Sequence, residues 1–439
     1  MPYKVITLKW AVTDCFIHAS DLHLDAPLGR LGRLDEEARR RLAAEAGEAW
    51  SSLVELTIAE GASFLVLAGD IFHNGVGNAA VQVKFHEGLR SLGAKDIRVL
   101  ICHGNHDPLT ADFGRIGDLP DNVEVFPAGS PTTYEVDLHH GGAVSVSGLS
   151  FGQRHETDNL AERFRLLEPA CRPHVAVLHA NLDGNGDHDP YAPCKIEDLV
   201  AAPVDYWALG HIHLRSVHTL APNRYAAYCG NLQGRNFKDA ECHPKGAYVV
   251  PVEDGQIREP TFVACDRVRF VQNDVSVEPD DDIEAVIDRI NATARSAATG
   301  AERRPVVWSL TLVGRHRDPS AIRRLVDFDD TNSHDALGGG DLAKVLNGGG
   351  LALAKSDVTL HRSREELIAE GGVRAMVLRA LDDDVVRSTL ERLIKDLPAS
   401  IPRKVLTEGE EDLDINDLLE QVAILAEDLL VARLGESSG

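Results

Sequence analysis

The sequence has no apolar run long enough to cross a membrane as a helix. Such a helix needs about 18 or more consecutive apolar residues, and the 439-residue chain contains no such run. Residues 1–13 carry two lysines but neither a long apolar stretch nor a small-residue cleavage site, so we expect no signal peptide. These absences predict a cytoplasmic protein that does not insert into a membrane.

Paired cysteine motifs are missing as well. The seven cysteines are an odd number and are scattered without a Cys-x-x-Cys spacing, which indicates reduced thiols rather than a disulfide framework. This spacing also argues against a zinc site built from thiolates. The glycine runs at 338–340 and 348–350 lack the Gly-Lys-Ser/Thr ending of a nucleotide-binding P-loop.

Five short hydrophobic runs are each followed by side chains that bind metal ions. The runs are bounded by glycine or polar residues, as buried strands are; they are Cys15–Ile17, Phe64–Ala68, Ile97–Ile101, Val175–Leu178 and Tyr206–Leu209. The side chains that follow them are, in chain order, Asp21 and His23, Asp70, Asn105, His179, and His211 with His213. Because these side chains occur only at the carboxyl ends of the runs, we expect them along one rim of a sheet. That rim is where open α/β sheets form their sites.

The chemistry of this set favours a pair of divalent metal ions. Carboxylate, imidazole and amide ligands together suit Mn²⁺, Fe²⁺ or Zn²⁺, and two ions about 3.5–4 Å apart can clamp the attacking and leaving oxygens of a phosphoryl transfer. Asp70, alone at the end of its run, is the natural bridging carboxylate. Asp21, His23 and one imidazole of the last motif would complete one site. Asn105, His179 and the other imidazole would complete the second.

His106 and Asp107 directly follow the expected amide ligand. A histidine beside a metal ligand, but not itself bound, can stabilise a developing oxyanion or protonate a leaving oxygen. We expect the neighbouring Asp107 carboxylate to hold the other ring nitrogen of His106 and so to orient it. The sequence thus predicts His106 and Asp107 as catalytic residues.

The motifs in this order resemble the calcineurin-like metallophosphoesterase superfamily. Their variants narrow the resemblance to bacterial DNA-repair exonucleases, the SbcD-like nuclease subunits, and among these to a YhaO-like branch. The segments that carry it span about residues 14 to 265; they are Ser20–Leu24, Gly69–His73, Gly104–Asp107 and Tyr228–Arg235. The Asp-Arg-Gly motif of phosphoprotein phosphatases is replaced by Phe72-His73-Asn74, which disfavours that substrate class. Cys229 stands where these nucleases usually have proline or a small residue, which puts the DNA-facing loop in question.

The resemblance implies a role for each residue of the site. By family analogy, Asp21, His23, Asp70 and His213 would hold one ion. Asp70, Asn105, His179 and His211 would hold the other, with Mn²⁺ first and Fe²⁺, Zn²⁺ or Mg²⁺ as alternatives. The position of His106 is catalytic in that family, and that of His73 helps engage DNA. Arg235 is a further candidate for substrate binding. The family also implies an SMC-like ATPase partner and leaves a homodimer open.

The formal net charge of −24 argues against a nuclease. Contacts between basic side chains and phosphate dominate the affinity of proteins for nucleic acid. Two facts weaken this objection. Bound metal ions add positive charge at the site, and much of the acidity is remote, since ten acidic residues and one basic residue lie between Glu408 and Glu436. Several basic residues follow the last metal motif: Arg215, Arg224, Arg235 and Lys238. We expect weak DNA binding by the isolated chain, improved by a partner.

The remaining patterns predict an α/β fold with three parts. Residues 14–266 would form a two-sheet αββα sandwich, with crossover helices at 34–60 and 78–92 and a hairpin of strands at 132–138 and 143–149. Strands near 216–220, 225–228 and 247–252 would belong to a second sheet. Residues 267–362 would form a small α/β cap, with strands at 268–277, 306–313 and 351–360, a helix at 281–295 and a short helix at 321–326. Residues 363–439 would form an acidic helical region with helices at 364–397 and 414–434, the last of which either packs on its own domain or docks the ATPase.

Three functions remain open from the sequence. The first is a DNA nuclease, exonuclease or endonuclease, that hydrolyses backbone phosphodiesters with two metal ions. The second is a phosphatase or phosphodiesterase acting on nucleotides or other small phosphoesters, although such enzymes need no added cap and helical tail. The third is a non-catalytic scaffold, which the complete set of competent ligands argues against.

Overall fold

The structure is a computed structural model that describes residues 14–29, 36–73, 79–110, 118–183, 191–316, 318, 321–322 and 351–361. The chain divides into two compact units. The first contains Met1–Asp274, Asp288–Thr311 and Asp329–Ser356, and the second contains Val275–Ile287, Leu312–Phe328 and Asp357–Gly439. Both large sheets and all the predicted site residues belong to the first unit.

The first sheet has a parallel centre extended by antiparallel strands. Its order is β12-β11-β1-β2-β3-β4, and β13 also pairs with β11. The strands are β1 (Asp14–Ala19), β2 (Phe64–Ala68), β3 (Arg98–Cys102), β4 (Val123–Val125), β11 (Gly246–Glu253), β12 (Gln256–Ile257) and β13 (Thr261–Ala264). β1 to β4 run parallel. Their nearly continuous apolar runs suit strands that are covered on both faces.

Helices make the crossovers of this sheet, as expected. α1 (Glu36–Ala46) and α2 (Ala49–Ala59) join β1 to β2, and α3 (Ala79–Gly93) joins β2 to β3. The single helix predicted at 34–60 is wrong, because the chain breaks at Gly47 and Glu48 into α1 and α2. Glycine is among the poorest helix formers, since its backbone loses the most freedom on folding.

The second sheet has the order β5-β6-β7-β8-β10-β9. Its strands are β5 (Thr132–Asp137), β6 (Ala143–Leu149), β7 (His174–His179), β8 (Tyr206–Gly210), β9 (Ser216–Ala221) and β10 (Arg224–Tyr228). β6, β7, β8 and β10 are parallel, and the two edge strands are antiparallel to their neighbours. One short helix, α4 (Ile196–Ala201), precedes β8, and two 3-10 turns lie at Leu160–Phe164 and Asp239–Glu241.

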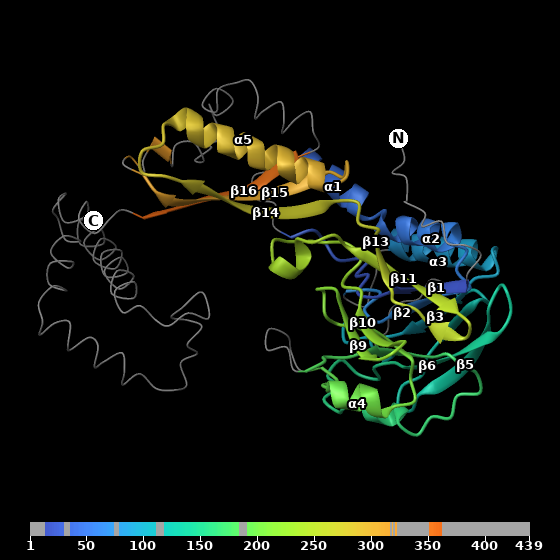
Figure 1. The fold of residues 1–439 in the computed structure, drawn as a ribbon. Helices are drawn as coiled ribbons and strands as arrows, with labels where there is room; N and C mark the ends of the chain where they lie inside the picture. The colour runs from blue at the N-terminus through green and yellow to red at the C-terminus, as the bar shows by residue number, and fades with distance from the viewer. Residues whose placement is uncertain are drawn as a thin grey trace, which may run out of the picture. The chain divides into compact units, whose positions relative to one another are not determined.

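Apolar side chains from both sheets fill the space between them. Phe16 and Phe64 stack with ring centroids 4.7 Å apart, and Tyr206 of the second sheet meets Phe16 edge-on at 5.4 Å. On its other face, the first sheet packs against α2 and α3, and the second sheet packs against α4 (Figure 1). The predicted αββα sandwich is therefore confirmed.

The assignment of strands to sheets differs from the sequence prediction in two places. The five ligand-bearing runs do not share one sheet: β1, β2 and β3 are in the first, and β7 and β8 are in the second. Strand β11, expected in the second sheet, pairs antiparallel with β1 in the first. The reason is physical, since an apolar run records that a strand is buried but not which strand it pairs with.

A third sheet follows the sandwich along the chain. It has the order β14-β15-β16, with strands β14 (Arg269–Val277), β15 (Val306–Arg315) and β16 (Leu351–His361), and α5 (Ile283–Gly300) joins the first two. These elements match those predicted for the cap. Of the short helix expected at 321–326, only Ala321 and Ile322 are described, and both are helical. The helices predicted at 364–397 and 414–434 lie outside the described residues. Within the described part, no helix is long and apolar enough to span a membrane.

Candidate metal centre

The predicted ligands converge even though they come from two sheets. Asp21 and His23 follow β1, Asp70 follows β2 and Asn105 follows β3, while His179 ends β7, and His211 and His213 follow β8. Four of these residues have a positive φ: Asp21 (50°), His23 (43°), Asp70 (54°) and His211 (100°). Such a conformation costs a non-glycine residue about 1–3 kcal/mol and is concentrated at functional sites. The chain is thus strained where the ligands meet.

Hydrogen bonds and glycines hold the loops of the centre close together. The backbone N–H of Asp21 donates to Gly69 O at 3.0 Å, and that of His23 donates to Asp70 O at 3.0 Å. A Cβ atom at Gly104 would collide with the Asp70 carboxylate and with the His179 ring. Glycine is therefore required there for the approach of β3 to its neighbours.

One group of ligands consists of Asp21, His23 and His213. Their ligand atoms all lie within 4.8 Å of one another. His213 Nε2 is 3.8 Å from Asp21 Oδ1, and the Nε2 atoms of His23 and His213 are 3.3 Å apart. His213, rather than His211, therefore lies with Asp21 and His23, which favours one of the two alternatives that the pattern of residues left open.

A second group consists of Asp21, Asp70 and His179, again within 4.8 Å of one another. His179 Nε2 lies 3.4 Å from Asp70 Oδ2 and 3.0 Å from Asn105 Oδ1. The ring of His211 packs edge-on against that of His179, with centroids 5.3 Å apart. Asp70 lies between the groups, because the same Oδ2 atom is also 3.8 Å from His23 Nε2.

The electrostatics of the buried carboxylates fit bound cations. Burial raises the pKa of Asp21, an effect that His179 and His213 only partly offset. Burial also acts to raise the pKa of Asp70, but the charges of His179, His23 and His106 and a hydrogen bond from His179 together outweigh it and leave that pKa below its usual range. The two carboxylates are 0% and 2% exposed and are surrounded by imidazoles and an amide oxygen. A pair of divalent ions would compensate their buried negative charge and would find suitable ligands in this set.

Oxygen acceptors fix the rings of three histidines. The Nδ1 atoms of His179 and His106 lie 2.9 Å from Ala68 O and 3.0 Å from His73 O, and a carbonyl can only accept. His213 Nδ1 lies 2.6 Å from the Glu241 carboxylate. Each ring therefore keeps a proton on Nδ1 and leaves Nε2 as the atom available to the centre, which is the arrangement that metal-binding histidines use.

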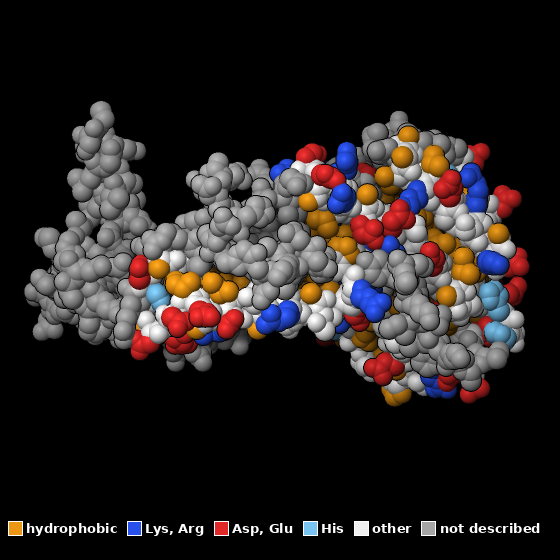
Figure 2. Space-filling model, turned by 90° about the horizontal axis from the view of Figure 1, so that it is seen from above, with side chains coloured by type: hydrophobic (Ala, Val, Ile, Leu, Met, Phe, Trp, Pro, Cys, Tyr) orange, Lys and Arg blue, Asp and Glu red, His pale blue; other side chains and the backbone are white. Residues whose placement is uncertain are grey.

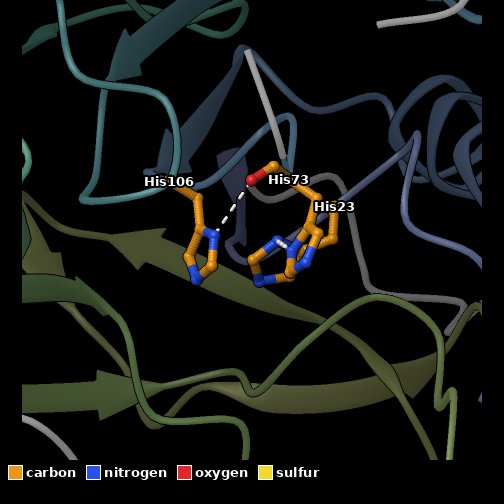
Figure 3. Close-up of side chains that lie close together, drawn as sticks. All are labelled: His23, His73 and His106. Carbon is orange, nitrogen blue, oxygen red and sulfur yellow. Dashed lines mark hydrogen bonds between the residues drawn. The ribbon is translucent and has the colours of Figure 1, made fainter. Parts of the chain in front are cut away.

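His106 lies beside His23, one of the predicted ligands, and beside His73 (Figure 3). Its ring is stacked on that of His73, with centroids 4.5 Å apart and an angle of 18° between the planes. Its backbone N–H donates to Asp70 Oδ1 at 2.9 Å. His106 is half-buried, so it can meet a substrate that approaches the centre.

The expected orientation of His106 by Asp107 is wrong. The Asp107 carboxylate is fully buried and accepts from the backbone N–H groups of Gly104 (2.8 Å), Ile71 (2.8 Å) and Asp70 (3.2 Å). It therefore fastens the loop after β3 to the loop after β2. The carbonyl of His73 takes the orienting role instead. A side chain adjacent in sequence points away because the chain turns sharply at this loop.

Arg235 also differs from its prediction as a substrate-binding residue. Its guanidinium donates to the carbonyl oxygens of Ala26, Leu22 (3.3 Å) and His23 (2.7 Å). These bonds occupy the charged group with the loop that carries His23. Arg235 thus positions that loop, and the expected contact with substrate is not supported.

Sequence patterns missed Glu241. This residue is 5% exposed, and its carboxylate accepts from His213 Nδ1, from the Asn231 amide at 2.9 Å and from the Arg235 backbone N–H at 2.9 Å. Burial alone would raise the pKa of Glu241. The hydrogen bond from His213 and the charges of His213 and Lys245 instead lower it to about 2. No local signal marks Glu241, because it lies 28 residues after His213 in a short 3-10 turn.

Cys229, which departs from the resembled pattern, faces the interior. It is 1% exposed, and its Sγ lies 3.2 Å from the Ser20 hydroxyl, which itself donates to Asp21 Oδ2 at 2.6 Å. Cys229 is therefore part of the packing beneath Asp21 rather than of a DNA-facing surface. Two other nearby histidines hydrogen-bond within the fold: His18 lies between Tyr206 and Leu209, and His174 lies between Ser147 and Pro203.

Comparison with known proteins gives a consistent picture. Residues 16–215 match the calcineurin-like phosphoesterase family. The chain is 34% identical over 242 residues, 55% of its length, to an uncharacterized metallophosphoesterase, YhaO, of Bacillus subtilis. It is 25% identical to the DNA double-strand break repair protein Mre11 of Sulfurisphaera tokodaii over 53% of its length, and 25% identical to that of Archaeoglobus fulgidus over 58%. The matches span 58% of the length of each of these three relatives.

Proposed function

We propose that this protein, whose residues 16–215 match the calcineurin-like phosphoesterase family, is a two-metal nuclease that hydrolyses phosphodiester bonds of DNA. The observation that carries the proposal is the position of Asp70, whose Oδ2 lies within 3.8 Å of both His23 and His179. A carboxylate that approaches imidazoles of both ligand groups is what a metal pair requires. The similarity to two archaeal Mre11 repair proteins supports DNA as the substrate.

The donor set assigns ligands to two ions, with Mn²⁺ preferred. Asp21, His23, Asp70 and His213 would hold the first ion. Asp70 would share the second with three further ligands: Asn105, His179 and His211. When bound, the pair supplies positive charge that stabilises the attacking and leaving oxygens of the phosphodiester.

His106 would carry out the proton transfer. The His73 carbonyl holds its Nδ1 proton, so Nε2 is the atom that exchanges a proton with the substrate. As an imidazolium, His106 would give this proton to the leaving oxygen, a step typical of general acids. The ring of His73, stacked on His106, lies where it can contact the DNA backbone beside the scissile bond.

The proposal extends to partners and location. Acidic and basic side chains are interspersed over the face seen in Figure 2, where the described residues form no large basic surface. Tight binding to DNA needs many cationic contacts to phosphate. We therefore expect a partner, an SMC-like ATPase, to supply part of the DNA affinity in the cytoplasm, with a homodimer as the assembly to test.

A hydrolase of small phosphoesters is the second candidate. The net charge of −24 favours it, because a small substrate needs no extended basic surface. The two candidates differ in the size of the substrate that they cleave.

A nuclease assay separates them. With Mn²⁺, the full chain is expected to cleave linear duplex or single-stranded DNA, and His106→Ala should lower the rate about 10²- to 10⁴-fold because a proton-transfer group is lost. His218→Ala, a matched change on strand β9, should leave the rate unaltered. Cleavage of small esters alone would favour the second candidate, and no turnover with metal bound would indicate a scaffold.

A further inference from the structure

Three imidazoles face one another at the edge of the metal centre. His23, His73 and His106 bring their ligand atoms within 4.8 Å of one another, and Figure 3 shows the rings gathered on one side of the loop that carries His73. The Nδ1 atoms of His23 and His73 are 3.4 Å apart. The ring centroids of His23 and His106 are 5.0 Å apart. Of these three histidines, the proposed ligand assignment uses only His23.

Two nitrogens of the cluster have the spacing of ligands on a tetrahedral cation. Nitrogens bound to zinc at about 2.0–2.1 Å are roughly 3.3–3.4 Å apart in tetrahedral geometry, which is the separation of the His23 and His73 Nδ1 atoms. His106 keeps its Nδ1 proton on the His73 carbonyl and so offers Nε2. A ligand atom of His106 lies within 4.8 Å of those of the other two histidines, and its ring, now stacked on that of His73, would have to turn to aim Nε2 at the same ion.

The composition of the cluster sets its preference among metals. All three donors are imidazole nitrogens, whereas the neighbouring ligand groups contain carboxylates. Imidazole suits zinc and other late transition metals, and carboxylate oxygens suit manganese and magnesium. The cluster therefore favours Zn²⁺ over Mn²⁺.

We infer that His23, His73 and His106 form a third cation site that binds Zn²⁺ and inhibits the enzyme. A neutral imidazole has one lone pair. When His23 offers Nδ1 to this site, its Nε2 carries the proton. Nε2 can then no longer bind the ion that His23 would share with Asp21 and His213. The lone pair of His106 is occupied at the same time, so it can no longer exchange a proton. The inhibition depends on the proposed function, whereas the binding of Zn²⁺ does not.

Zinc binding is tested in the full-length chain with the neighbouring ligand groups disabled. The double variant Asp21→Asn, Asp70→Asn removes the carboxylates of both neighbouring groups but keeps the three histidines. Competition with a fluorescent zinc indicator should show one bound Zn²⁺. Adding His73→Asn should weaken that binding at least tenfold, and adding His218→Asn should leave it unchanged. Thermal melting of each variant checks that it is folded.

Two results would overturn the inference: no zinc bound by the folded double variant, or equal zinc affinity with and without His73→Asn. Should the double variant not fold, the wild type and His73→Asn are compared after loading with Co²⁺. The wild type should then show additional visible absorption typical of tetrahedral nitrogen coordination, and identical spectra would refute the site. Failure of manganese-loaded wild type to cleave DNA would refute the proposed function and leave the zinc result standing.

Discussion

At the scale of single residues, oxygen acceptors behind the histidines decide which nitrogen faces the centre. The carbonyls of Ala68 and His73 and the carboxylate of Glu241 each take an Nδ1 proton. Of these acceptors only Glu241 carries a charge, so it also strengthens the ring of His213 as a donor to metal. Its own three bonds keep it in place.

Glu241→Gln should therefore weaken metal binding without unfolding the chain. Glutamine keeps an oxygen near His213 but loses the charge, and such changes behind a ligand lower metal affinity about 10- to 100-fold. Calorimetric titration with Mn²⁺ measures the effect. Asp239→Asn is the matched control, because Asp239 lies in the same 3-10 turn with an exposed side chain. Equal Mn²⁺ affinity in the two variants would show that Glu241 has no positioning role.

At the scale of helices and strands, local sequence patterns predicted where the strands lie better than which strands pair with each other. The five ligand-bearing strands and the hairpin of β5 and β6 lie within one or two residues of their predicted bounds, because short apolar runs end at glycine or polar residues. The placement of β11 was wrong because pairing depends on distant residues. The expected orientation of His106 by Asp107 was wrong for the same reason, and the bonds of Arg235 to the loop of His23 were not foreseen: the partner of a side chain depends on the loop geometry, which no sequence spacing records.

The interface between the sheets should account for much of the stability. Phe64 is fully buried there and stacks on Phe16, so Phe64→Ala should lower the free energy of unfolding by about 3–5 kcal/mol. Phe262 contacts the same core from its rim and is only partly buried. Phe262→Ala should cost clearly less. Chemical denaturation measures both, and equal losses would contradict the assignment of the core.

At the scale of the whole molecule, the cysteines behave as small apolar residues. Every cysteine is a free thiol, and burial raises the pKa of Cys15, Cys194 and Cys229 to about 12 from an ordinary value of 9.0. Neighbouring acidic residues add to the shifts of Cys15 and Cys194. Thiols that stay protonated in this way are weak nucleophiles.

These thiols predict that alkaline pH destabilises the fold. Below pH 9 they are protonated in both the folded and the unfolded chain, so they add no pH dependence. Between pH 9 and 12 the unfolded chain releases protons that the folded chain retains, and stability falls. The free energy of unfolding should drop by about 1.4 kcal/mol per thiol from pH 8 to pH 10. Urea denaturation at both values tests this, with Cys194→Ala expected to lessen the drop. An unfolding free energy that does not fall over this interval would contradict the burial of the thiols.

Anomalous diffraction from crystals soaked in Mn²⁺ tests the proposed metal pair most directly. Two manganese peaks about 3.5–4 Å apart, with the Asp70 carboxylate between them and His23 and His179 on opposite sides, are the predicted result. A single peak, or peaks remote from Asp70, would contradict a two-metal centre.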